Sequence, residues 1–290
     1  MGYYKIPAPP ALRGLVDSFS FWEGGEPSAE RMAVMATRAV SLQIDLHDDE
    51  LRWYQGDDRA YTLKGVTVAG PQSRPFAVDA WQPRIVRVVF RPGGARPFVR
   101  ASPGELRDTH LPLEDIWGRG AARLQHRLAD AHGPGEIFRI LGEALTAAAP
   151  REPALRPAVA QALAVAGERP GVSVSDLARS TGLSPKRLIQ VFTQEVGLTP
   201  KLFLRITRFQ RLLAGVCDLP SVDWAAMAAT HGYFDQSHMI RDFHDFAGTT
   251  PATYIARRGP AGQHAQAQAA RQPLPAQRAD LSPGPGCPGR

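Results

Sequence analysis

The sequence predicts an α+β protein, with a β-rich N-terminal domain and flanking helices followed by an all-α domain. Up to about residue 100, short apolar stretches alternate with Gly and Pro, as in strands joined by turns. Beyond residue 113 the apolar residues recur at helical spacing. Two segments near the C-terminus repeat one helix-turn-helix pattern, joined by a long helix. We therefore expect domains at residues 1–150 and 153–259, and a tail at 260–290.

Five extended segments are expected in the N-terminal domain: residues 41–46, 51–54, 62–69, 76–78 and 85–90. A polar turn at residues 47–50 should join the first two segments as a hairpin. Its sequence, His-Asp-Asp-Glu, has no second ligand cluster at a matching spacing, so we expect a solvated turn and no metal site.

Helices are expected at residues 113–132 and 136–149, and a further helix at 157–168 opens the second domain. From residue 260 onward the chain is rich in Pro, Gly, Ala and Gln and has almost no large apolar residues. Such a composition cannot offset the entropy of ordering, and it predicts disorder.

Composition and charge narrow the class of function. No apolar run approaches the ~18 residues of a membrane span, and no leader is visible, so we expect a cytoplasmic protein without a membrane partner. Only Cys217 and Cys287 are present, too far apart to indicate a disulfide framework or a Cys-type zinc site. The net charge is +6, and residues 153–259 hold 12 Lys and Arg against 8 Asp and Glu. This excess favours a polyanionic partner.

The first helix-turn-helix unit spans residues 174–192. Ser175 is expected to cap its first helix, and Gly182 permits the left-handed turn. Ser184 then caps the second helix, with Pro185 at its first position. The buried stripe should contain Leu188, Val191 and Phe192, and the outward face Lys186, Arg187, Ile189 and Gln190.

The second unit spans residues 223–246. Asp223 caps its first helix, Gly232 makes the turn, Phe234 fills the angle between the helices, and Asp235 caps the second helix. The buried face should contain Met239, Phe243 and Phe246, and the outward face Gln236, Ser237, His238 and Arg241.

Each unit ends in Gly-x-Thr-Pro, at residues 197–200 and 248–251, which stops one helix and starts the next. The first of these motifs begins a connecting helix at residues 200–213, about 21 Å long at 1.5 Å per residue. Such a spacer suits two recognition helices in adjacent major-groove segments about 34 Å apart.

The outward side chains are of types that read DNA. Arg241 can bond guanine bidentately, Gln236 and Gln190 can bond adenine, and Ser237 and His238 are adaptable polar readers. Lys186 and Arg187 complete the base-reading candidates. Lys201, Arg205 and Arg208 are the candidates for phosphate contact. The alternative for each cation is a solvated surface charge.

Residues 232–251, GYFDQSHMIRDFHDFAGTTP, resemble the signature of the AraC/XylS family of transcription regulators. The resemblance covers residues 155–256 and implies that two helix-turn-helix units bind DNA. It places Gln236, Ser237, His238 and Arg241 at base-facing positions, with Lys186, Arg187, Ile189 and Gln190 as their counterparts in the first unit. The chain departs from the family at Gln190, where Arg is frequent, and after Arg208, where a small residue is usual.

The N-terminal half resembles, more faintly, the sensor-type domain of one subgroup of that family. The resemblance lies in residues 4–13, 21–22 and 90–98 and implies sensing or dimerisation. Four tryptophans could line a ligand pocket or belong to the core: Trp22, Trp53, Trp81 and Trp117.

We therefore expect a sequence-specific regulator that binds double-stranded DNA, with a small effector modulating it through the N-terminal domain. We expect no enzyme activity, catalytic residue, cofactor or metal. Two alternatives are a constitutive regulator whose N-terminal domain only dimerises, and an enzyme fused to a DNA-binding module. A fused repair methyltransferase would need a reactive cysteine, which the N-terminal half lacks. RNA polymerase and a second copy of the chain are further partners to consider.

Overall fold

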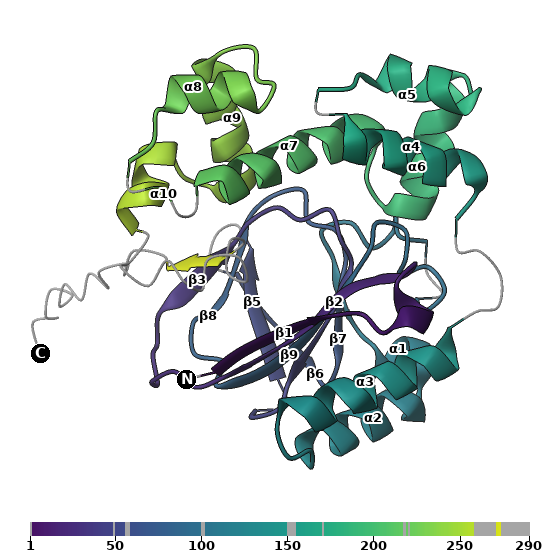
Figure 1. Ribbon diagram of the computed structural model, residues 1–290. Coiled ribbons are helices and arrows are strands. Elements are labelled where there is room, and N and C mark those ends of the chain that lie inside the picture. The colour runs from purple at the N-terminus through teal and green to yellow at the C-terminus, as the bar shows by residue number, and fades with distance from the viewer. Residues whose placement is uncertain are drawn as a thin grey trace, which may run out of the picture.

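The computed structural model describes residues 2–48, 50–55, 59–99, 102–149, 155–169, 171–216, 219, 221–257 and 271–273. Two antiparallel sheets form the N-terminal part, and a row of helices lies along one side of them (Figure 1). This arrangement confirms the predicted α+β class. Among the described residues, no helix is long and apolar enough to cross a membrane.

The larger sheet has the strand order β1-β2-β9-β4-β7-β10, and all its strand pairs are antiparallel. Its strands are β1 (Gly2–Pro7), β2 (Val16–Glu23), β9 (Arg84–Phe90), β4 (Ser41–Asp45), β7 (Thr67–Ala69) and β10 (His110–Pro112).

The smaller sheet has the order β11-β3-β8-β5-β6. Its strands are β11 (Arg271–Pro273), β3 (Arg31–Val34), β8 (Phe76–Asp79), β5 (Glu50–Gln55) and β6 (Arg59–Lys64). The edge strand β11 comes from the segment predicted to be a disordered tail and pairs with β3. The rest of that segment lies outside the described residues, as do both cysteines.

Two strand predictions were wrong. Residues 41–46 and 51–54 do not form a hairpin, because β4 lies between β9 and β7 while β5 belongs to the other sheet. All five residues of β4 are buried, so this strand needs a central position that a hairpin at a sheet edge does not provide. Residues 62–69 are not one strand either. Gly65, at φ 74°, divides them between β6 and β7 and so between the two sheets.

Three helices cover the face of the larger sheet that is turned away from the smaller one: α1 (Glu114–Trp117), α2 (Arg119–Ala129) and α3 (Pro134–Ala148). The single helix predicted at 113–132 is broken at Gly118, whose φ is 52°. The short helix η1 (Pro10–Leu12) joins the same core. Phe19 of β2 stacks on Phe138 of α3 at 6.4 Å between ring centroids.

The helical part contains α4 (Pro157–Glu168), α5 (Val174–Thr181), α6 (Pro185–Val196), α7 (Pro200–Val216), α8 (Trp224–Thr230), α9 (Gln236–Ala247) and α10 (Pro251–Arg257). Helix α7 runs between two helix pairs, α5–α6 and α8–α9 (Figure 1). Its 17 residues span about 25 Å, one turn more than the predicted 200–213. Phe203 of α7 packs against Phe192 of the first pair, and Phe209 packs against Phe243 of the second. Both helix pairs therefore pack against buried side chains of α7.

Candidate nucleic-acid interface

The first helix of the first unit begins two residues earlier than predicted. Ser173, not Ser175, caps α5, because its Oγ accepts a hydrogen bond from the Asp176 amide at 3.1 Å. Ser175 already lies inside the helix. Gly182 takes the left-handed conformation that turns the chain, with φ 67°, and Ser184 Oγ accepts from the Arg187 amide at 3.3 Å to cap α6.

Helix α6 divides into the two faces that the sequence predicts. Its buried residues include Leu188, Val191 and Phe192, and its exposed residues include Lys186, Arg187, Ile189 and Gln190. Within the exposed face, Arg187 Nη1 donates to Gln190 Oε1 at 2.7 Å. These two candidate readers therefore bond to each other in the free protein, and a base must compete with that bond.

The turn of the second unit differs from the prediction at one residue. Phe234 does not fill the angle between α8 and α9, because its side chain is 93% exposed. Tyr233 fills it and is 5% exposed. In the first unit the residue after Gly182 points inward and the next one caps the helix. The second unit has one residue more between Gly232 and the cap Asp235, and that extra residue is Phe234.

Counted from their caps, α6 and α9 present equivalent positions. Asp235 Oδ1 accepts from the His238 amide at 2.6 Å, as Ser184 does from Arg187. In this register Lys186 corresponds to Ser237, Arg187 to His238, Ile189 to Ile240, and Gln190 to Arg241. Gln236, Ser237, Ile240 and Arg241 are exposed, and His238 is half-buried.

A fully buried carboxylate, Asp242, connects α9 to α7. Its Oδ1 accepts from Arg205 Nε at 3.1 Å and Nη2 at 2.7 Å, and its Oδ2 accepts from Arg208 Nη2 at 3.1 Å. Arg205 also donates to Asp245 at 2.6 Å and lies over the Phe246 ring. A buried charge without partners would be costly, and the two arginines offset that cost. They thereby set the position of the helix on α7.

Arg208 also reaches the turn before α9. Its Nη1 donates to the Gly232 carbonyl at 3.3 Å, its Nη2 lies 3.1 Å from His238 Nε2, and its guanidinium stacks over the Tyr233 ring at 4.3 Å. Of the three phosphate candidates, Lys201 is exposed, whereas Arg205 and Arg208 are engaged within the second unit.

Sequence reasoning missed Asp242, although a signal was present. The residue stands directly before the buried Phe243, at the position that Val191 occupies in the first unit. A carboxylate in a buried stripe requires cations opposite to it. Arg205 and Arg208, three residues apart on the connecting helix, are spaced to supply them from one face.

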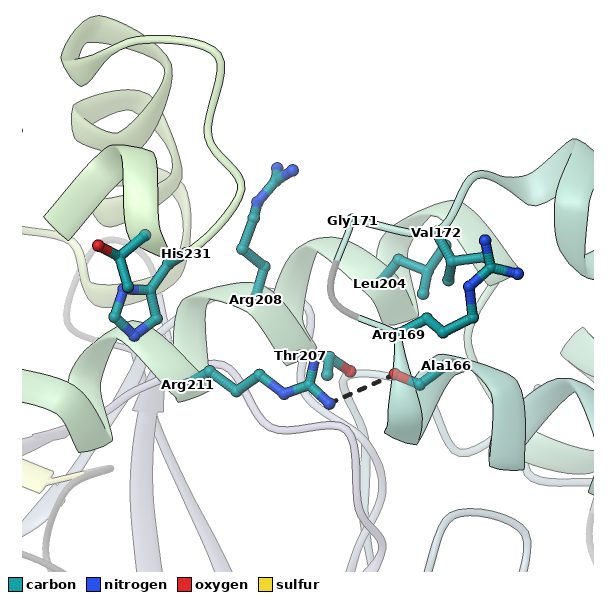
Figure 2. A pocket seen from close by; sticks show the side chains of 10 residues that line it. Ala166, Arg169, Gly171, Val172, Leu204, Thr207, Arg208, Arg211 and His231 are labelled. Carbon is teal, nitrogen blue, oxygen red and sulfur yellow. Dashed lines mark hydrogen bonds between the residues drawn. The ribbon is translucent and has the colours of Figure 1, made fainter. Parts of the chain in front are cut away.

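A cavity of about 360 Å³ lies between the two units and is lined by residues from α4, α7 and α8 (Figure 2). Arg211 of α7 donates to the carbonyls of Ala166 and Gly167 at the end of α4. Because Arg208 bonds Gly232, two arginines of α7 contact both the end of α4 and the turn of the second unit. The loop before α5 also approaches the turn of the second unit, since a Cβ placed on Gly232 would lie 3.9 Å from the Gly171 Cα.

The loop after β3 attaches the β domain to the second unit. The Ala36 amide donates to the Phe246 carbonyl near the end of α9 at 2.9 Å, and Gln210 of α7 donates to the Ala36 carbonyl at 3.3 Å. Arg38 donates to Thr207 of α7 at 3.1 Å. Met35 and Ala36 are buried in the core of the helical part.

The end of α6 is attached as well. Glu195 is buried there, accepts a hydrogen bond from the Arg156 amide at 3.0 Å, and forms an ion pair with Arg96 at 3.8 Å. Ser102 donates to the Gln194 carbonyl at 3.0 Å. The C-terminal ends of both candidate recognition helices therefore contact the β domain or its linker.

Polar side chains gather on the face of the larger sheet that is turned toward the smaller one. Gln43 pairs in register with Thr67 and Arg87, and each of the three has a buried polar atom without a hydrogen-bond partner among the described residues. The His110 ring lies on this face too, 4.6 Å from the Trp53 ring of the smaller sheet. Burial lowers the pKa of His110 to about 4, so the ring is neutral at pH 7.

The remaining predictions concern the four tryptophans and the possibility of a metal site. Trp53 belongs to the small apolar cluster between the sheets, and Trp117 donates from Nε1 to the Phe98 carbonyl at 2.8 Å. Trp22 and Trp81 are half-buried, and Trp81 lines a cavity to which the other three tryptophans do not contribute. Within the part of the chain that the structure describes, no three His, Cys, Asp or Glu side chains are grouped to hold a metal ion.

Comparison with protein-family models matches residues 177–257 to a helix-turn-helix domain. Residues 4–112 match a domain of unknown function, DUF6597. The first match begins inside α5 and ends with α10, so it includes both helix pairs and α7. Comparison with curated proteins found no match.

Among solved structures, ToxT from Vibrio cholerae is 9% identical, with a TM-score of 0.40 over 88% of this chain and 97% of that chain. ToxT from Vibrio cholerae O395 is 8% identical, with a TM-score of 0.40 over 89% and 97%. The same protein bound to (E)-4-(8-methylnaphthalen-1-yl)but-3-enoic acid has a TM-score of 0.41 and 8% identity over 88% and 97%.

Proposed function

The chain belongs to the AraC/XylS family of transcription regulators, and on this premise we propose that α6 and α9 enter successive major grooves of one DNA site. The observation that carries the proposal is the equivalence of the two helices. Each is capped at the same place and presents polar side chains at the same positions. Helix α7 packs against both units and so spaces them along one side of the molecule.

In this proposal the second unit reads most of the sequence. Arg241 bonds a guanine bidentately, Gln236 bonds an adenine, and Ser237 and His238 contact neighbouring base edges. In the first unit Gln190 is the adenine reader, and Lys186 and Arg187 add charge close to the phosphates. Arg187 and Gln190 exchange their mutual bond for contacts to DNA.

The phosphate candidates take different roles. Lys201 is exposed and stands at the start of α7, where it can neutralise a phosphate. Arg205 and Arg208 act as positioning residues, because their donors engage Asp242, Asp245 and Gly232. Through Arg208 the position of His238 depends on α7 as well.

We further propose that a small effector binds between the two sheets and modulates DNA binding. Two observations support this. Buried polar atoms of Gln43, Thr67, Arg87 and His110 have no hydrogen-bond partner among the described residues, and the β domain contacts the ends of both recognition helices. An effector that moves the loop around Ala36 relative to Glu195 would change the angle between the units. Dimerisation and contact with RNA polymerase stay predictions of the sequence.

The test is the selection of DNA fragments from a genomic library by the full chain, followed by sequencing. We expect a bipartite site whose two halves lie about one helical turn apart, centre to centre. Binding that does not distinguish selected from random fragments would contradict sequence-specific recognition. Thermal-shift screening of the same protein against small molecules then tests the effector. If a small molecule no longer raises the unfolding temperature of a Gln43→Ala variant, the result supports a binding site between the sheets. An unchanged rise in that variant would contradict such a site.

A further inference from the structure

Three exposed apolar side chains lie on the elements that approach DNA. Phe234 is 93% exposed, Ile189 43% and Ile240 38%. Across the described residues only three other large apolar side chains are exposed to a comparable degree: Tyr4, Ile6 and Leu219. Half of the exposed large apolar residues therefore belong to α6, α9 or the turn that leads into α9.

Single exposed apolar residues are common on protein surfaces and need no explanation by themselves. The positions of these three do call for one. Ile189 and Ile240 are each the fifth residue after a helix cap, so they occupy the same place in the two recognition helices. Each is followed directly by a candidate base reader, Gln190 or Arg241.

Phe234 is distinguished by its position in the turn. It directly precedes the cap Asp235, at the end of α9 that faces the bases when a recognition helix enters the major groove. The neighbouring Tyr233 already fills the angle between the helices, so Phe234 has no packing role in the described structure. Its side chain is therefore exposed to solvent at the start of α9.

We propose that Phe234, Ile240 and Ile189 recognise the C5-methyl groups of thymine in the major groove. This inference rests on the proposed insertion of α6 and α9. The thymine methyl is the apolar group that base pairs present on that edge, and Phe is among the side chains suited to it. Because Ile189 and Ile240 are equivalent, the DNA site should carry a thymine at the same relative position in both halves. Phe234 should add one more thymine to the half that α9 reads.

The experiment uses the full chain and the DNA site obtained by fragment selection, with each thymine replaced singly by deoxyuridine. That change removes the methyl group and keeps the base pair. We expect about fourfold weaker binding for each contacted methyl, the value that corresponds to one buried methylene-sized group. In Phe234→Ala the penalty at one of these thymines should disappear, while the penalties at the other two persist. Ile240→Ala and Ile189→Ala should each abolish the penalty at a different thymine.

Ile6→Ala is the matched control, because Ile6 is an exposed apolar residue of β1, away from both helix pairs. It should leave every deoxyuridine penalty unchanged. Phe234→Ala should unfold at the same temperature as the parent protein, since its ring is exposed. Two results would contradict the recognition of thymine while leaving the proposed insertion of the helices intact. One is an affinity for the selected site that does not change when thymine is replaced by deoxyuridine, and the other is a loss of affinity on replacement that persists in all three variants. Equal binding to selected and random DNA would overturn the proposed insertion of the helices together with the recognition of thymine.

Discussion

The two helix-turn-helix units have the same arrangement of turn, cap and buried stripe, but different contacts stabilise them. In both, a glycine turns the chain, a polar side chain caps the second helix, and a buried stripe packs on α7. At one position of that stripe the first unit has Val191 and the second has Asp242. The first unit is therefore held by apolar packing and by contacts of Glu195 with the linker, and the second by an ion-pair cluster centred on its recognition helix.

The difference extends to the exposed faces. The first unit presents Lys186 and Arg187 where the second presents Ser237 and His238, and Gln190 where the second presents Arg241. Two adjacent positive charges suit binding to the phosphate backbone, whereas a bidentate arginine and adaptable polar groups suit base reading. One helical frame can thus serve two purposes. The unit that is held by the more directional contacts is also the one that we expect to discriminate sequence.

The largest expected effect tests the ion-pair cluster. Asp242→Ala leaves Arg205 and Arg208 without their shared carboxylate, and we expect a loss of about 3 kcal/mol in the free energy of unfolding. Asp245→Ala is the control, because Asp245 is exposed and bonds only Arg205. Its effect should stay below about 1 kcal/mol. Urea titrations followed by circular dichroism measure both. Equal losses in the two variants would mean that Asp242 does not hold α9.

The second prediction concerns the recognition of bases by Arg241 and Gln190. Arg241→Ala should cost about 1–3 kcal/mol of specific binding and relax the preference at one base pair. The equivalent change in the first unit, Gln190→Ala, should cost less, because Gln190 gives up its bond to Arg187 when it binds a base. Mobility-shift titrations on the selected site and on random DNA give the two ratios. A larger loss of specificity in Gln190→Ala would reverse the assignment of reading to the second unit.

The caps provide a test in which the two units should agree. Ser184→Ala and Asp235→Ala each remove one side-chain bond to a backbone amide at the start of a recognition helix. We expect each to lower the free energy of unfolding by about 1 kcal/mol. Differential scanning calorimetry suffices for the comparison. A much larger effect at Asp235 would indicate that the ion-pair cluster depends on the cap.

The smallest expected effect on affinity concerns contacts to the DNA phosphates. Lys201→Ala should weaken binding to all DNA sequences alike and reduce the slope of log affinity against log salt by about 0.9, the value for one phosphate contact. Arg208→Ala should lower affinity for the specific site by misplacing His238 and should leave that slope nearly unchanged. Titrations at several salt concentrations separate the two. A slope that falls in Arg208→Ala would return Arg208 to the phosphate contacts.

Local features of the chain sufficed to predict the frame of the helical part. Gly182, Gly232 and the caps Ser184 and Asp235 act through neighbouring backbone atoms, so their roles can be inferred from a few residues of sequence. The outward and buried faces of α6 and α9 follow from helical spacing for the same reason. The exposure of Ile189 was among these predictions, whereas that of Ile240 was seen only in the structure.

Only the tertiary structure decided the contacts made over long sequence distances. Spacing alone could not show that Phe234 faces water and Tyr233 the core, because one added residue in the turn exchanges them. It could not separate β4 from β5, whose partners come from distant strands. The sequence indicated that Asp242 needs cationic partners, but only the structure showed that both Arg205 and Arg208, more than 30 residues earlier, bind it. Local sequence determined the helices α6 and α9, whereas their placement depends on packing and on ion pairs that form only in the folded chain.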